Sequence, residues 1–282
     1  MTASNERILV RGAGDLATGV ISRLHHAGLE VGATELEHPL TVRRTVAFST
    51  AMYEGSIEVE RVTARRVDGE ESWSTALERR EIPIVGCAGV PSWLEGSAIV
   101  VDARLGKRNI DTSADDGQFV IALGPGFVAG EDCHAVIETQ RGHRLGRIIA
   151  RGSAQPDTDT PGIVQGRGRE RVIRAPGDGH VDWVSEIGAH VATGALLGSI
   201  GADQIRAPFD GVVRGLIHRS CRVRSGMKIG DIDPRPDTSA CDEISDKALA
   251  IGGAVLTAMM GFLAERQADE MSDVRPVLTG TP

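Results

Sequence analysis

Aromatic side chains, long basic runs and strongly apolar runs are all scarce in this sequence of 282 residues. Only 3% of the residues are aromatic, so the core must be built from Val, Ile, Leu and Ala. The net charge is −8 and no long basic run occurs, which argues against a broad phosphate-neutralising face and therefore against nucleic-acid binding. The length suits about two domains.

Cysteine and lysine are also sparse. The four cysteines, Cys87, Cys133, Cys221 and Cys241, are far apart and form no CxxC pair. The sequence therefore predicts neither a structural zinc site nor a redox dithiol, and we expect no metal. The three lysines are Lys107, Lys228 and Lys247, and the other cationic side chains are arginine.

No segment is typical of a signal peptide or a membrane span. Met1 to Arg7 is polar and lacks an apolar signal core. The most apolar stretch, 248–264, is rich in Ala and Gly and shorter than the roughly 20 strongly apolar residues of a usual span. We expect it to be a buried helix of a cytoplasmic protein without membrane contact, with Ser245 as its N-cap.

The first 35 residues have the order of elements of a Rossmann-type nucleotide site. A short apolar strand at 8–10 leads into a glycine loop at 11–17, a helix at 15–27 and a second strand at 30–34. In such a loop small residues permit the tight turn, the approach of a pyrophosphate and close packing of helix on strand. Those residues are Gly12, Gly14 and Ala17. The alternative is a strand-to-helix turn that binds nothing.

Acidic and basic side chains follow this unit. Glu35 lies about 20 residues after the loop, where an acid can accept hydrogen bonds from a ribose. Arg43 and Arg44 are predicted to bind a 2′-phosphate or another anion, unless they form a solvated basic turn. Asp15 inside the loop is unusual for NAD use. It either matches the charge of the helix start or faces a polar ligand group.

Further strands are expected at 57–63, 82–86, 99–102 and 119–123. Asp102 and Arg104 end the third of these, at the edge where open α/β sheets bind ligands. Gly124 and Gly126 form a rigid turn after the fourth, and we assign them to the same ligand site. The alternative for Arg104 is a solvated surface position.

A second group of reactive side chains lies between 132 and 143. It consists of Asp132, Cys133, His134, Glu138 and His143. Such a group can supply a thiolate with a nearby base, and we predict a catalytic role for it with Cys133 as the nucleophile. The alternative is a small buried thiol beside a hairpin, because the spacing matches no standard zinc signature.

The C-terminal region contains an internal repeat. Arg174-Ala175-Pro176 recurs as Arg206-Ala207-Pro208, and the 32-residue offset continues without a gap. Each half is predicted to form strand, Asp-Gly turn, strand, turn and strand. Two such halves resemble the barrel-sandwich hybrid of biotinyl and lipoyl carrier domains. The hairpin between them, at 201–204, has no lysine, so we expect no biotin or lipoate.

Together these features predict an α/β Rossmann-like N-terminal domain, a β-rich C-terminal module of the barrel-sandwich hybrid, biotinyl/lipoyl-like kind, and a C-terminal helix. The boundaries are 1–126 for the nucleotide-binding domain, 127–170 for a β-hairpin segment and linker, 171–235 for the duplicated module and 240–266 for the helix.

Several motifs resemble one family, the YqeB-type accessory proteins of the selenium-dependent molybdenum hydroxylase system. They run over nearly the whole chain and lie at 11–19, 42–46, 124–127, 132–139, 141–143, 229–233 and 244–253. The resemblance implies a role in the maturation of molybdenum hydroxylases, enzymes related to xanthine dehydrogenase. It supplies no catalytic residues.

The leading hypothesis is therefore an accessory factor that binds a nucleotide or a molybdopterin-type dinucleotide in the crevice. Its partners would be a molybdenum hydroxylase or other maturation factors. One alternative is an NAD(P)-dependent oxidoreductase, although no Tyr-x-x-x-Lys pair is present and Tyr53 is the only tyrosine. Another is a non-enzymatic scaffold that docks the hydroxylase through the duplicated module.

Overall fold

A computed structural model describes residues 7–87, 89–97, 99–157 and 162–273. Its centre is a nine-stranded sheet in the order β3-β4-β5-β2-β1-β6-β7-β8-β9. The strands are β1 (Ile8–Arg11), β2 (Val31–Glu35), β3 (Ser56–Val59), β4 (Val62–Val67), β5 (Ile82–Gly86), β6 (Ile99–Asp102), β7 (Phe119–Leu123), β8 (Ala135–Ile137) and β9 (Ile148–Ile149). The central strands are parallel, and the two edge strands, β3 and β9, are antiparallel to their neighbours.

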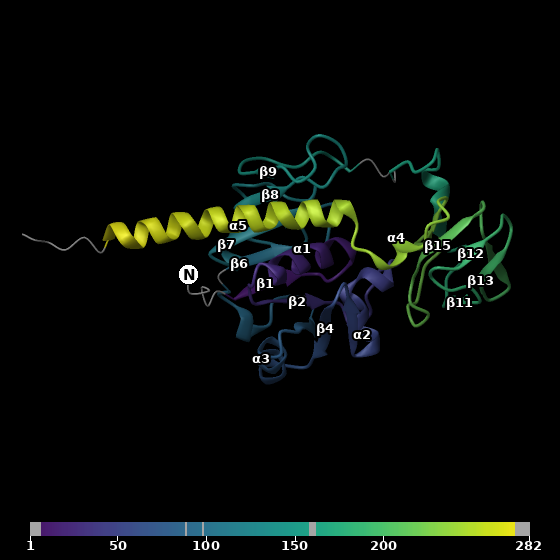
Figure 1. Ribbon diagram of the computed structural model, residues 1–282, viewed down its shortest axis with the longest axis horizontal. Helices are drawn as coiled ribbons and strands as arrows, with labels where there is room; N and C mark the ends of the chain where they lie inside the picture. The colour runs from purple at the N-terminus through teal and green to yellow at the C-terminus, as the bar shows by residue number, and fades with distance from the viewer. Residues whose placement is uncertain (1–6, 88, 98, 158–161, 274–282) are drawn as a thin grey trace, which may run out of the picture.

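Helices cover the sheet unevenly. They are α1 (Asp15–His26), the short α2 (Ala51–Glu54), α3 (Glu70–Glu78), the short α4 (Ser239–Asp242) and α5 (Asp246–Asp273). Figure 1 shows α5 lying along α1 over the sheet. The largest apolar core joins α1 and α5 to the sheet, and a smaller cluster around Trp73 packs α3 on other residues of the sheet.

The Rossmann-like expectation is wrong. In that fold successive parallel strands are joined by helices that cover both faces. Here no α-helix joins β6 to β7 or β7 to β8, and the sheet is mixed because both edges are antiparallel. The C-terminal helix α5, from the other end of the chain, takes the place beside α1. The strands β8 and β9, from the predicted segment 127–170, extend this same sheet.

The C-terminal module forms two separate antiparallel sheets. One is four-stranded, with the order β10-β16-β15-β12, and the other is three-stranded, with the order β11-β13-β14. The strands are β10 (Val172–Arg174), β11 (Asp182–Trp183), β12 (His190–Val191), β13 (Leu196–Ile200), β14 (Asp203–Arg206), β15 (Gly211–Leu216) and β16 (Lys228–Asp233).

The barrel-sandwich hybrid expectation is therefore wrong as well, because the strands divide unequally between the two sheets instead of forming two matched ones. The repeat has a counterpart in single strands. β13 and β16 lie one repeat apart, and each pairs with a strand on both sides.

Hydrogen bonds and ring stacking join the module to the sheet domain. The Tyr53 hydroxyl donates to the carbonyl oxygen of Pro39 at 2.7 Å and lies 2.8 Å from the Cys221 sulfur. Its ring stacks on His218 with 3.9 Å between the centroids. Burial and the Cys221 contact raise the pKa of Tyr53, so its hydroxyl stays protonated. It can therefore keep its contacts with Pro39 and Cys221, which connect the two parts of the protein.

The C-terminal helix α5 begins directly after the predicted N-cap Ser245, later than the predicted segment start at 240, and it ends later than 266. The Ser245 hydroxyl accepts a hydrogen bond from the Ala248 amide at 3.2 Å, as an N-cap does. By length and composition alone, the stretch Ser239–Asp269 is apolar enough to cross a membrane. In the structure α5 packs against α1, β7, β8 and β9.

Glycines let α1 and α5 approach closely. A Cβ on Gly19 would lie 2.6 Å from backbone atoms of Ala248, and one on Gly252 would lie 2.5 Å from the Gly19 carbonyl oxygen. Backbone atoms cannot yield as a flexible side chain does, so the two helices would have to move apart. A Cβ on Gly253, the next residue of α5, would meet nothing within 4 Å.

We predict that Gly252→Ala destabilises the protein by about 1–3 kcal/mol through overpacking, whereas Gly253→Ala stabilises it by about 0.5–1 kcal/mol because alanine is the better helix former. Denaturant unfolding followed by circular dichroism measures both changes. Equal effects from the two neighbouring substitutions would contradict the tight crossing.

Candidate functional site

The glycine loop forms a tight turn between β1 and α1. Gly12 has a φ of +96°, a conformation that glycine adopts readily, and its amide donates to the Thr34 carbonyl at 2.8 Å. A Cβ at Gly12 would lie 3.3 Å from the Arg104 amide nitrogen. Gly14 precedes α1 in an extended conformation, and Ala17 is buried in the first turns of the helix.

Glu35 forms a hydrogen bond with the backbone of this glycine loop. Its carboxylate accepts hydrogen bonds from the Ala13 amide at 2.8 Å and from the Leu36 amide at 2.7 Å. Burial raises the pKa of Glu35, and the two backbone bonds oppose that rise. An amide that a bound phosphate would use in a nucleotide site is therefore already paired with a carboxylate.

Asp15 and the two predicted anion-binding arginines join distant segments. Arg43 is buried and binds Asp15 at 2.6 Å, while its other terminal nitrogen donates to the Ala240 carbonyl at 2.9 Å. Arg44 donates from Nε to the Leu216 carbonyl at 2.7 Å. Both guanidinium groups thus attach the loop region to the C-terminal segment and the β module.

Asp102 and Arg104 belong to a polar network at the carboxyl ends of β1 and β6. Asp102 is fully buried and binds Arg104 at 2.6 Å and the Thr112 hydroxyl at 2.5 Å. Arg11, which lies opposite Asp102 in the β1–β6 register, binds Asp111 at 2.7 Å. Burial alone would lower the pKa of Arg104, but its bonds to Asp102 and Asp111 raise it.

The reactive side chains between 132 and 143 are bound to different parts of the backbone. Asp132 accepts from the Val128 amide and from the Asn109 side chain, both at 2.8 Å. Burial raises the pKa of the Cys133 thiol to about 11, so it is protonated at neutral pH. Nucleophilic cysteines instead have lowered pKa values.

In the described structure, the side chains of His134, Glu138 and His143 form no hydrogen bond or ion pair with one another. His134 accepts from the Val120 amide at 2.9 Å through Nδ1. Glu138 is buried and accepts from the Gln140 and Gln155 amides at 2.8 Å each, and His143 is exposed. Among the described residues, no three His, Cys, Asp or Glu side chains are grouped so that they could hold a metal.

Gly124 and Gly126 bring two loops into contact. Gly124 has a φ of +87°, and a Cβ on Gly126 would overlap the Gly106 carbonyl oxygen. The loop after β7 therefore packs directly against the loop after β6. Pro125, between the two glycines, faces a cavity.

This cavity, which we call the edge cavity, has a volume of about 410 Å³ and lies at the carboxyl ends of β6, β7 and β8. That size is within the range of small-molecule sites. Its lining comes from six separate segments and consists of Leu16, Leu105, Lys107, Pro125, Thr139, Gln140, Arg141, Gln155, Pro156, Asp157, Gly162 and Lys247.

Three cations line the edge cavity, and they differ in pairing. Lys107 binds Asp157 at 3.1 Å, and Arg141 binds both oxygens of Asp246 at 2.8 and 2.7 Å. Lys247 has neither a hydrogen bond nor an ion pair with any residue that the structure describes. Burial lowers the pKa of Lys247, and the charge of Arg141 lowers it further.

Two helices begin at the edge cavity. Leu16 is in the first turn of α1 and Lys247 in the first turn of α5, and both line it. The N-terminal end of a helix carries a partial positive charge and free amide donors. Together with the three cations, these ends favour an anion in the cavity.

The sequence predicted a ligand role for Gly124 and Gly126, which flank the lining residue Pro125, but it did not single out the residues after β8 or Lys247. A signal for Lys247 was present, because lysine is rare in this chain and this one begins the final helix.

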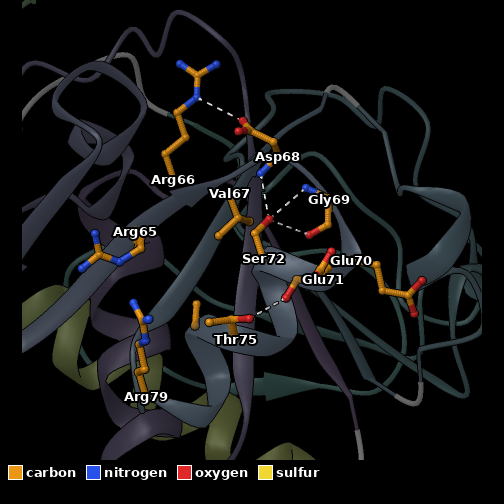
Figure 2. A pocket seen from close by; sticks show the side chains of 11 residues that line it. Arg65, Arg66, Val67, Asp68, Gly69, Glu70, Glu71, Ser72, Thr75 and Arg79 are labelled. Atoms are coloured by element: carbon orange, nitrogen blue, oxygen red, sulfur yellow. Dashed lines mark hydrogen bonds and ion pairs between the residues drawn. The ribbon is translucent and has the colours of Figure 1, made fainter.

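A larger cavity of about 620 Å³ lies between β4 and α3 (Figure 2). Its polar groups satisfy one another: the Ser72 hydroxyl lies 3.2 Å from the amides of Asp68 and Gly69, which donate to it. Figure 2 shows Arg65, Arg66 and Arg79 spread along one side of it. Arg65 is paired with Glu81 at 2.7 Å. The bonds to the Ser72 hydroxyl stabilise the first turn of α3.

Comparison with known proteins gives one strong sequence match. No protein-family model matches the chain. The "Uncharacterized protein YqeB" of Escherichia coli (strain K12) is 46% identical over 259 residues, which cover 92% of this chain. They cover 48% of that protein, so the chain spans about half the length of this relative.

Solved structures match only distantly. An aspartoacylase family protein from Mesorhizobium loti is 11% identical with a TM-score of 0.27, and the match covers 83% of this chain and 87% of that one. A succinylglutamate desuccinylase/aspartoacylase from Rhodobacter sphaeroides is 15% identical with a TM-score of 0.24, over the same shares of the two chains. TM-scores this low support no conclusion about the fold or the function of this chain. The sequence match is the informative one, and on it the chain is a relative of YqeB along nearly all of its own length.

Proposed function

We propose that this protein is an accessory factor that holds a small phosphate-bearing ligand in the edge cavity during the maturation of a molybdenum hydroxylase. One observation carries the ligand part: Lys107, Arg141 and Lys247 line one cavity at which two helices begin. The pathway part is supported by the motifs shared with YqeB-type proteins.

The ligand is placed in the edge cavity rather than on the glycine loop. Glu35 accepts from the Ala13 amide, and a bound phosphate beside that carboxylate would meet like charge. The two terminal nitrogens of Arg43 are bound to Asp15 and to backbone carbonyls. Lys247 lines the cavity and pairs with none of the residues that the structure describes, so its ammonium can bind an anion without breaking an ion pair described there.

The first experiment measures binding of inorganic pyrophosphate, a nucleoside diphosphate, molybdopterin dinucleotide and NAD(P)H by calorimetry and native mass spectrometry. Binding of a phosphate-bearing molecule supports the proposal. Hydride transfer from NAD(P)H to a substrate would favour an oxidoreductase instead. Binding of none of them would refute the edge cavity as an anion site.

We predict that Lys247→Met weakens binding of pyrophosphate by about 10- to 100-fold, because a hydrogen bond to a charged group contributes about 1.5–3 kcal/mol. The matched control is Arg79→Gln, which removes an exposed cation from the other cavity and should leave the affinity unchanged. Unfolding curves of both variants show whether the fold is intact. Equal losses in the two variants would argue against a specific site.

We also predict a pH dependence. Burial lowers the pKa of Lys247, as does Arg141, while Asp15, Asp157 and Glu138 act in the opposite direction. The cation is therefore lost as pH rises through a value below the ordinary pKa of lysine. Pyrophosphate affinity should fall over that range. Lys247→Arg should abolish the fall, because arginine keeps its charge. The same alkaline decline in Lys247→Arg would assign the titration to another group.

A further inference from the structure

Lys247 differs from the other cations of the edge cavity because it has no hydrogen-bond or ion-pair partner within 7–87, 89–97, 99–157 and 162–273. Lys107 and Arg141 are each held by a carboxylate, Asp157 and Asp246 respectively. An ion pair fixes the position of a cation and favours its charged form. Lys247 lacks that stabilisation, although it lies next to Asp246 in the chain, because Asp246 binds Arg141 through both oxygens.

The surroundings of Lys247 make its ammonium group easier to deprotonate than that of an exposed lysine. The side chain is half-buried, Arg141 is near enough to repel its charge, and it lies in the first turn of α5, where the helix end is positive. These effects outweigh the attraction of Asp15, Asp157 and Glu138, so the pKa of Lys247 is lowered. A lysine amine becomes a nucleophile when such an environment removes its proton. An arginine at this position would remain charged, so the residue type matters here.

We propose that Lys247 is a catalytic nucleophile that forms an imine with an anionic carbonyl compound bound in the edge cavity. This inference rests on the proposed function, since it adds a carbonyl group to the anion expected there. The remaining lining suits such a ligand: Arg141 and Lys107 attract the phosphate or carboxylate, and Leu16, Leu105 and Pro125 contact the carbon skeleton.

The step needs no co-reactant. The lone pair of the Lys247 Nζ attacks the carbonyl carbon, and the C=O π bond breaks to give a carbinolamine. The carbonyl oxygen then leaves as water, carrying two hydrogens that were on the amine, and a C=N bond replaces the C=O bond. No oxidant or reductant is consumed. Hydrolysis reverses the step and restores the free amine.

Pyridoxal 5′-phosphate is a suitable probe because it carries both an aldehyde and a phosphate. The full-length protein is treated with it, reduced with borohydride and mapped by peptide mass spectrometry. The chain has only three lysines, so assignment is simple. We expect one adduct per chain at Lys247, together with an aldimine absorbance band before reduction. Because its pKa is lowered, Lys247 has the larger neutral fraction and should react faster than exposed Lys228.

Two variants complete the test. Lys247→Arg should lose the band and the adduct while still binding pyrophosphate, and Lys228→Arg should behave like the wild type. Equal labelling of Lys228 and Lys247, or an adduct at Lys107 instead, would overturn the inference.

The two proposals fail in different ways. If pyrophosphate binds and competes with the probe but no adduct forms at Lys247, the imine is refuted and the anion site stands. If pyrophosphate does not bind to the wild type, the proposed function fails, whatever the labelling shows.

Discussion

The close crossing of α1 and α5 determines where the candidate site can be. Gly19 and Gly252 let the two backbones touch, and both helices begin at the carboxyl edge of the sheet. α5 comes from the far end of the chain, and its largest contact, with α1, helps to bring Lys247 to the loops that follow β6, β7 and β8. A wider crossing would move the first turn of α5 away from the cavity. The site therefore depends on two positions without side chains.

A second constraint is that most charges at this edge are already paired within the protein. Glu35 bonds to the Ala13 amide of the glycine loop, Arg43 bonds to Asp15, and Asp102 bonds to Arg104. Each bond compensates the cost of burying a charge and leaves little for a ligand. Lys247, the cation of the edge cavity that has no partner in the described part of the chain, is then the natural binding point. This explains why a glycine loop with the right spacing need not hold the phosphate itself.

Local features were predictable from the sequence, and long-range ones were not. The buried run of β1, the tight turn at Gly12 and the start of α5 after Ser245 follow from neighbouring residues. The expected strand at 57–63 is in fact the hairpin of β3 and β4, turned at Glu60 and Arg61 in left-handed conformations that usually signal Gly or Asn. The packing of α5 beside α1 could not be predicted, because no local pattern shows that two helices so far apart in the sequence pack together. The edge cavity was missed for the same reason, since six separate segments line it.

The choice of lysine at 247 is informative because this chain uses arginine at nearly every other cationic position. An arginine would bind an anion as well or better, and its charge would not depend on burial. Lysine offers one property that arginine lacks, an amine that can lose its proton and attack. Arg141 and Lys107 already supply fixed positive charge in the cavity, each held by its carboxylate. A third cation that served only to bind an anion could equally be an arginine, whereas an amine beside two fixed charges suits a site that holds an anion and reacts with it.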